Sequence, residues 1–151
     1  MIENEVIRAR SGSQRNAEIQ AKAERMGVDE AYISLLVDTF YERIQANEQL
    51  GPIFAGEIKG DWTPHLDKMK SFWASATMNT GSYDGRPVPA HMKLQGVEPE
   101  HFQIWLGLFE QTLRDTAPSE EAVPYFLDKA RMIAQSLQFA MFGLPNLPTR
   151  R

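Results

Sequence analysis

The sequence contains no cysteine, and this absence excludes several kinds of chemistry. Without a thiol the chain can form no disulfide, thiolate nucleophile, iron–sulfur cluster or cysteine-ligated zinc site. Histidine is scarce too, because only His65, His91 and His101 are present. A nitrogen-ligated metal centre in this chain would therefore depend on very few side chains.

Long hydrophobic runs and an excess of positive charge are also missing. No apolar stretch approaches the ~20 residues that span a bilayer, and the polar start "MIENEVIRARSGSQRN" lacks the apolar stretch of a secretory signal. The net charge of −4 disfavours a nucleic-acid-binding protein, which normally has a basic face. We therefore expect a cytoplasmic protein that neither spans a membrane nor binds nucleic acid.

The apolar residues that are present recur at helical spacing, and no segment alternates with a period of two. The sequence therefore predicts an all-α fold in one domain. Residues 47–61 contain three glycines and one proline and are expected to form a connector. Helices are predicted over 13–26, from a cap at Asp29, from "DWTPHL" with Asp61 or Thr63 as cap, from Pro99, and over about 124–142.

Familiar catalytic motifs do not fit the histidines. The zinc-protease pattern H-E-x-x-H, a glycine-rich phosphate loop and a nucleophile elbow are absent. The segment "EPEH" is formally an E-x-x-H pair, but a di-iron bundle needs two such pairs and two further glutamates. Glu98, Glu100 and His101 are therefore interpreted as polar residues at a helix start.

Three polar side chains fall on otherwise apolar helix faces. They are Tyr41, His65 and Trp105. Each has an ordinary explanation by itself: a hydroxyl that reaches the surface, an exposed first-turn histidine and a core tryptophan. Together they place potential hydrogen-bond donors on three separate helices, each on a face expected to point inward, which suits a cavity with polar groups on one side.

A fourth residue, His91, stands in "PVPAHMKL" between those helices, where two prolines stiffen the approach to it. A fixed imidazole on one side of a cavity and donors on the other are what a haem iron needs. It takes one nitrogen ligand, an open position opposite, and apolar walls for the porphyrin.

Five segments together resemble the truncated haemoglobins, and specifically the third group of that family. They are "LVDTFYERI", "LGPIF", "DWTPHLDKMKSFW", "GSYDGRPVPAHMKL" and "HFQIWLGLFEQTL", in this order. The glycine motifs of the first two groups are missing, which is typical of the third. The resemblance implies a two-over-two α-helical sandwich around haem b. Residues 29–143 would form the globin domain, 1–28 an N-terminal extension that includes the helix predicted over 13–26, and 144–151 a loose tail.

The resemblance also implies roles for individual residues. His91 matches the proximal ligand to the iron, while Tyr41, His65 and Trp105 match the side chains of the distal pocket that stabilise a bound ligand. The walls of the haem pocket are expected at Phe54, Met69 and Phe72. Partners for the haem propionates are sought among Lys68, Tyr83 and Arg86, which could equally be solvated surface residues.

Three classes of function are compatible with these residues. Hydrogen bonds from Tyr41 and Trp105 would hold dioxygen too tightly for simple oxygen transport, so the first is redox chemistry with oxygen, nitric oxide or peroxide. This would be nitric oxide dioxygenase or peroxidase-like activity supported by an external reductase. In the second class His65 itself ligates the iron, giving a sensor or electron-transfer protein. The third is a helical interaction module without a cofactor.

Overall fold

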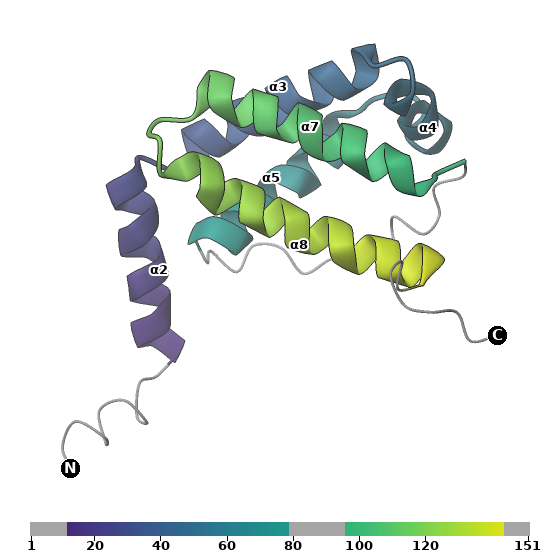
Figure 1. Ribbon diagram of the computed structural model, residues 1–151. Coiled ribbons are helices and arrows are strands. Elements are labelled where there is room, and N and C mark those ends of the chain that lie inside the picture. The colour runs from purple at the N-terminus through teal and green to yellow at the C-terminus, as the bar shows by residue number, and fades with distance from the viewer. Residues whose placement is uncertain (1–11, 79–95, 144–151) are drawn as a thin grey trace.

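The computed structural model describes residues 12–78 and 96–143, with side chains from residue 15 onward. Within these ranges the chain forms helices and no strand, which confirms the predicted all-α class. Figure 1 shows their arrangement. The helices are α2 (Gly12–Met26), α3 (Glu30–Ala46), α4 (Leu50–Glu57), α5 (Thr63–Met78), α7 (Pro99–Thr116) and α8 (Ala122–Phe142).

The first two helix boundaries follow the signals in the sequence. Helix α2 ends at Gly27, whose positive φ of 82° is a conformation that glycine adopts without strain. Asp29 then caps α3, because its side-chain oxygen accepts a hydrogen bond of 2.8 Å from the backbone N–H of Tyr32. Asp29 thus satisfies one of the free N–H groups at the start of the helix.

The expectation of a plain connector over residues 47–61 is wrong, because α4 occupies its centre. The side-chain oxygen of Asn47 accepts hydrogen bonds from the backbone N–H groups of Gln49 and Leu50, at 2.9 Å and 2.8 Å. Pro52 lies in the first turn, where a missing N–H costs no helical hydrogen bond. These local features make a helix of only eight residues possible despite the glycines.

Two pairs of helices form the body of the molecule. Helix α3 packs against α5, α7 packs against α8, and α3 also contacts α7 (Figure 1). The short α4 lies against α3 and the first part of α7, while α2 contacts α5 on the opposite side of the body. No helix in the described ranges combines the length and apolar character needed to cross a bilayer.

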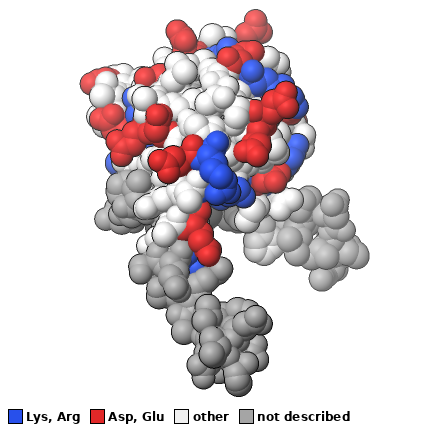
Figure 2. All heavy atoms as spheres, turned by 90° about the vertical axis from the view of Figure 1, so that its left-hand side faces the viewer, with Lys and Arg blue, Asp and Glu red and all other residues white. Residues whose placement is uncertain are grey.

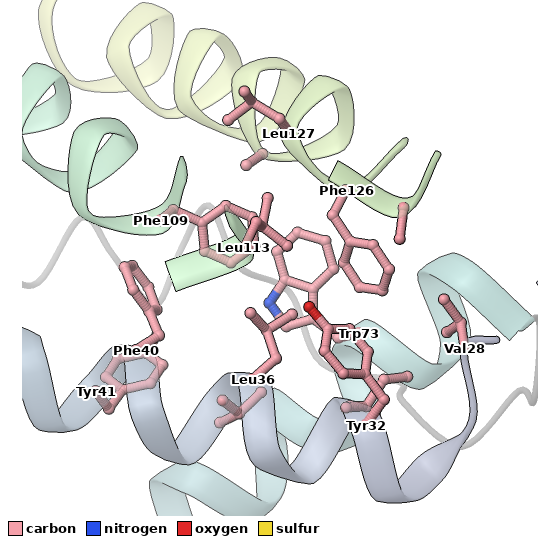
Figure 3. Close-up of a cluster of buried hydrophobic side chains, with 14 of the residues drawn as sticks. Val28, Tyr32, Leu36, Phe40, Tyr41, Trp73, Phe109, Leu113, Phe126 and Leu127 are labelled. Atoms are coloured by element: carbon pink, nitrogen blue, oxygen red, sulfur yellow. The ribbon is translucent and has the colours of Figure 1, made fainter. Parts of the chain in front are cut away.

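The interior is closed by aromatic rings from four helices. Trp73 of α5 stacks on Phe109 of α7 with ring centroids 5.1 Å apart, and Phe126 of α8 lies 5.6 Å from Trp73 on the other side (Figure 3). Tyr32 of α3 contacts Phe126 edge to face at 5.8 Å. Burying each such ring contributes roughly 1.5–3 kcal/mol, so this cluster holds the helices together.

The surface carries charges of both signs. On the face shown in Figure 2, acidic and basic side chains are interspersed over the described residues and no extended basic patch is formed. One ion pair joins α5 to α3, because Nζ of Lys70 lies 3.0 Å from Oδ1 of Asp38. Exposed pairs of this kind contribute little to stability.

Candidate functional site

Four aromatic rings meet where the last turns of α3 approach α4 and the start of α5. The rings of Tyr41 and His65 are 5.0 Å apart and nearly perpendicular, at 85°. Phe54 of α4 lies 6.0 Å from Tyr41 and is stacked at 6.5 Å on Trp62, which precedes α5. Trp62 in turn lies 6.1 Å from His65. We call Tyr41, Phe54, Trp62 and His65 the four-ring cluster.

Tyr41 supplies a buried phenol to this cluster. Its side chain is only 3% exposed, between Val37 and Ile44 on the inward face of α3. Burial in apolar surroundings raises the pKa of Tyr41, because the phenolate is less well solvated there than the neutral phenol. At neutral pH Tyr41 is therefore an O–H group able to donate a hydrogen bond.

His65 lies in the first turn of α5 and is half-buried, and its Nε2 atom is shielded from solvent. The ring is held by edge contacts to Tyr41 and Trp62. Helix α5 starts just before it, where the Asp61 side chain accepts a hydrogen bond of 3.0 Å from the backbone N–H of Thr63. The structure thus brings together Tyr41 and His65.

Trp105 of α7 reaches the same region from the other pair of helices. Its ring lies parallel to Phe109, with a 5° interplanar angle and centroids 5.9 Å apart. Phe40 joins it to the four-ring cluster, because Phe40 contacts Trp105 at 5.7 Å and Tyr41 at 5.2 Å. Trp105 is half-buried, which leaves part of the indole accessible from one side.

A cavity opens beside Trp105 and Phe54. Its volume is about 30 Å³, which has room for a water molecule but not for a larger ligand unless the surrounding groups move apart. The walls are almost wholly apolar, and they come from α4, the start of α7 and the last turns of α8. The lining residues are Leu50, Ile53, Phe54, Val97, His101, Phe102, Trp105, Leu137 and Met141.

The other residues predicted for the site are found in different settings. Met69 and Phe72 are half-buried and pack against the core, and neither lines the cavity beside Trp105. Lys68 is exposed on α5. The remaining predicted residues lie outside the described residues: His91, Tyr83 and Arg86.

The segment "EPEH" acts as a helix start, as its sequence interpretation proposed. The backbone N–H of Glu98 donates a hydrogen bond of 2.9 Å to Nδ1 of His101, which closes the first turn of α7. Within the described ranges no group of three or more acidic or histidine side chains is arranged to hold a metal ion.

Sequence reasoning missed Trp62 and most of the cavity wall. Trp62 contacts three of the predicted rings, and the available signal was its place three residues before His65, just ahead of the helix. Leu50 and Ile53 were missed because residues 47–61 were expected to be an unstructured connector. Val97 and Met141 had no signal of their own, since ordinary apolar residues line cavities and cores alike.

Comparison with known proteins bears on this arrangement. Residues 23–139 match the model of the family described as bacterial-like globin. The chain is 34% identical over 118 residues to the group 3 truncated haemoglobin ctb of Campylobacter jejuni, which covers 76% of this chain and 92% of that protein. It is 28% identical over 127 residues to the group 1 truncated haemoglobin GlbN of Mycolicibacterium paratuberculosis, covering 82% of this chain and 88% of that protein.

Solved structures agree with these relationships. The crystal structure of the group III truncated haemoglobin from Campylobacter jejuni superposes with a TM-score of 0.72 at 35% identity, covering 76% of this chain and 92% of that one. A tryptophan-to-leucine variant of the group II truncated haemoglobin from Bacillus anthracis superposes with a TM-score of 0.65 at 25% identity, covering 76% and 87%. The chain therefore belongs to the bacterial-like globins as a truncated haemoglobin of the third group, and it is a haem-binding globin.

Proposed function

We propose that this globin holds haem b through His91 and uses dioxygen, nitric oxide or peroxide in redox chemistry rather than delivering oxygen. When bound, haem would supply an iron that can take a small ligand such as dioxygen, and His91 would hold it. The observation that carries the proposal is the meeting of the Tyr41 phenol and the His65 ring, 5.0 Å apart, in surroundings that are otherwise apolar and aromatic.

The lining of the cavity fits a flat apolar ligand, and Tyr41 and His65 lie on the neighbouring four-ring cluster rather than in that lining. Phe54, Phe102 and Leu137 contribute apolar walls to the cavity, and Trp105 adds a broad ring. Such a lining favours a porphyrin, since most of its surface is apolar. The cavity is smaller than a porphyrin, so its walls and the chain outside the described residues would have to accommodate the ligand. His91, the proposed iron ligand, belongs to that part of the chain.

Tyr41 and Trp105 can act on a ligand that carries negative charge. The Tyr41 hydroxyl stays protonated because burial raises its pKa, and an indole N–H is always a donor. A hydrogen bond to a charged group contributes about 1.5–3 kcal/mol. Two such bonds would slow ligand release by several orders of magnitude, at about 1.4 kcal/mol per tenfold, which opposes a role in oxygen delivery.

Oxygen release is the experiment that tests this role of Tyr41. In stopped-flow measurements on haem-loaded, ferrous protein, Tyr41→Phe should release dioxygen at least tenfold faster, at about 1.4 kcal/mol lost per tenfold. Tyr32→Phe is the matched control, because Tyr32 is a buried tyrosine of the same helix that bonds Thr116 instead. Equal release rates in the parent and in Tyr41→Phe would remove the basis for the proposal.

The same ferrous sample distinguishes between substrates. Its reactions with nitric oxide and with hydrogen peroxide, compared with the rate of oxygen release, separate dioxygenase from peroxidase-like turnover. Both need electrons from an external reductase or small donor, which we include in the proposal. Rapid oxygen release with no reaction toward nitric oxide or hydrogen peroxide would favour an oxygen carrier.

A second candidate function follows from the position of His65. The shielded Nε2 atom lies on the same aromatic cluster as Tyr41, so this imidazole could itself ligate the iron and make a sensor or electron-transfer protein. The visible spectrum of the ferrous protein decides between the two. A bis-histidine spectrum that is lost in His65→Ala supports this candidate, and an open sixth position rejects it.

A further inference from the structure

A continuous series of ring contacts leads from the cavity into the core. Trp105, which lines the cavity, lies parallel to Phe109 at 5.9 Å, and Phe109 is stacked on Trp73 at 5.1 Å with an interplanar angle of 19°. One phenylalanine ring therefore lies between two indoles of different helices. Figure 3 shows Phe109 and Trp73 facing each other in the core.

The series continues from Trp73 to the opposite side of the molecule. Trp73 lies 5.6 Å from Phe126 of α8, and Phe126 contacts the neighbouring ring of Tyr125 at 5.9 Å. The hydroxyl of Tyr125 donates a hydrogen bond of 3.3 Å to the backbone carbonyl of Thr77. Tyr125 is half-buried, so its ring combines a fixed place at the end of the series with access to solvent.

Indole and phenol rings are the side chains of this chain that most readily lose an electron, because it has no cysteine. Phenylalanine is much harder to oxidise, but its ring fills the space between the tryptophans and shortens the gaps that an electron must tunnel across. The series thus contains three oxidisable rings in spatial order, Trp105, Trp73 and Tyr125. One phenylalanine ring lies between each neighbouring pair.

Two lysines lie beside the outer end of the series. The ammonium groups of Lys22 and Lys129 lie 4.8 Å and 4.7 Å from the centre of the Tyr125 ring. They come from α2 and α8, so the N-terminal helix helps to build this place. Two cations beside one ring attract small anions. They also make the oxidised Tyr125 ring a stronger oxidant toward such an anion. For the same reason they lower the driving force with which oxidised Trp73 can oxidise Tyr125.

We propose that Trp105, Trp73 and Tyr125 form an electron path to the haem pocket. A small anionic reductant, of the enediol class that includes ascorbate, would bind beside Lys22 and Lys129 and supply electrons to Tyr125. This inference rests on the proposed function, since the oxidant at the inner end is hydrogen peroxide in the haem pocket. It extends that function by naming where electrons enter and the chemical class of the donor.

The electron balance of a turnover is complete with these two reactants. Peroxide takes two electrons and two protons and becomes two waters. The ascorbate monoanion gives two electrons and one proton and becomes dehydroascorbate, and solvent supplies the other proton. In each one-electron step Tyr125 loses an electron through Trp73 and a proton to water, and it regains both when the donor reduces it. Tyr125 is therefore unchanged at the end.

The test maps where the protein is oxidised when peroxide is added to the haem-loaded full chain without reductant. A spin trap with mass spectrometry of the peptides should place an adduct on Tyr125. Tyr125→Phe should abolish that adduct, and Trp73→Phe should reduce it severalfold although Tyr125 is still present. Trp73→Tyr is the matched control, because it keeps an oxidisable ring and should restore the adduct. Hydroxyl radicals generated in solution should label Tyr125 equally in all variants that retain it.

The donor's place is tested in the same samples by electron paramagnetic resonance. Ascorbate should quench the tyrosyl radical signal severalfold faster in the parent than in the double variant Lys22→Gln/Lys129→Gln. Added salt should reduce the difference between the two quenching rates.

The outcomes of these tests separate the electron path, the donor site and the proposed haem function. Equal adduct in the parent and Trp73→Phe overturns the path, and equal, salt-independent quenching overturns the donor site. A chain that shows no Soret band with hemin before peroxide is added overturns the proposed function as well. If Trp73→Phe fails to fold, the absence of any Tyr125 adduct in the parent still rejects the path.

Discussion

The two halves of α5 have the same helical periodicity and very different surroundings. In the first half His65, Leu66 and Met69 are only half-buried, beside the four-ring cluster. In the second half Trp73, Ala74 and Thr77 are buried against neighbouring helices. The first half therefore leaves apolar and aromatic side chains partly exposed, while the second half is buried in the core.

Helix α7 repeats the pattern. Its first turns carry His101 and Trp105 toward the cavity, where both are half-buried. Its last turns bury Phe109, Thr112 and Leu113. The difference teaches that side chains of the same helix are buried at one end of the molecule and only partly buried at the end that carries the cavity. This is where a globin's haem is expected.

The largest effect should separate the two tryptophans. Trp73→Ala removes a side chain that is 4% exposed in the closed core, and should lower the free energy of unfolding by about 3–5 kcal/mol. Trp105→Ala should cost clearly less in the haem-free chain, because its ring is already half-exposed. Urea denaturation of both variants measures this. A larger loss for Trp105→Ala would show that the cavity end is the better packed of the two.

Haem binding should reduce the difference between the stability losses caused by substitutions at the two ends. A ligand that binds only the folded chain stabilises it by about 4 kcal/mol at a free concentration about a thousand times Kd. Hemin should therefore raise the urea midpoint of the parent chain, and the loss caused by Trp105→Ala should be larger with hemin than without it. The loss caused by Trp73→Ala should be the same in both conditions. Unchanged midpoints on adding hemin would contradict this.

A smaller effect should appear at alkaline pH. Burial raises the pKa of Tyr41 in the folded chain, so above the ordinary tyrosine pKa of about 10 the unfolded chain ionises first. Stability then falls as pH rises, by up to about 1.4 kcal/mol per pH unit. In Tyr41→Phe, the free energy of unfolding should therefore fall less steeply between about pH 9 and pH 11 than it does in the parent. Since burial also raises the pKa of Tyr32, only the difference between parent and variant is informative.

Regular features of the fold could be read from the sequence because their signals are local. Asp29 as a cap needed only its place before an apolar stripe. Of the stripe predicted for α7, Phe102, Phe109 and Leu113 are buried, while Trp105 and Leu106 are only half-buried. The buried position of Tyr41 followed from the spacing of its neighbours. Helix α4 did not, because its start depends on side-chain hydrogen bonds from Asn47 that override its glycines.

The site was less predictable than the fold. Periodicity places Trp73 and Trp105 equally on inward faces, but only the packing of α8 and α4 decides that one is enclosed and the other borders a cavity. Trp62 was missed because it precedes a helix and belongs to no stripe. The roles of His91, Tyr83 and Arg86 remain predictions from the sequence, since these residues lie outside the described ranges.

The central claim is that this chain holds haem through one imidazole. Its most direct test is an absorbance titration of the purified full chain with hemin, beside His91→Ala and His65→Ala. The account predicts a saturable Soret band for the parent, near-complete loss of stable haem retention in His91→Ala, and retention in His65→Ala. A Soret band of equal strength and stability in His91→Ala would contradict it.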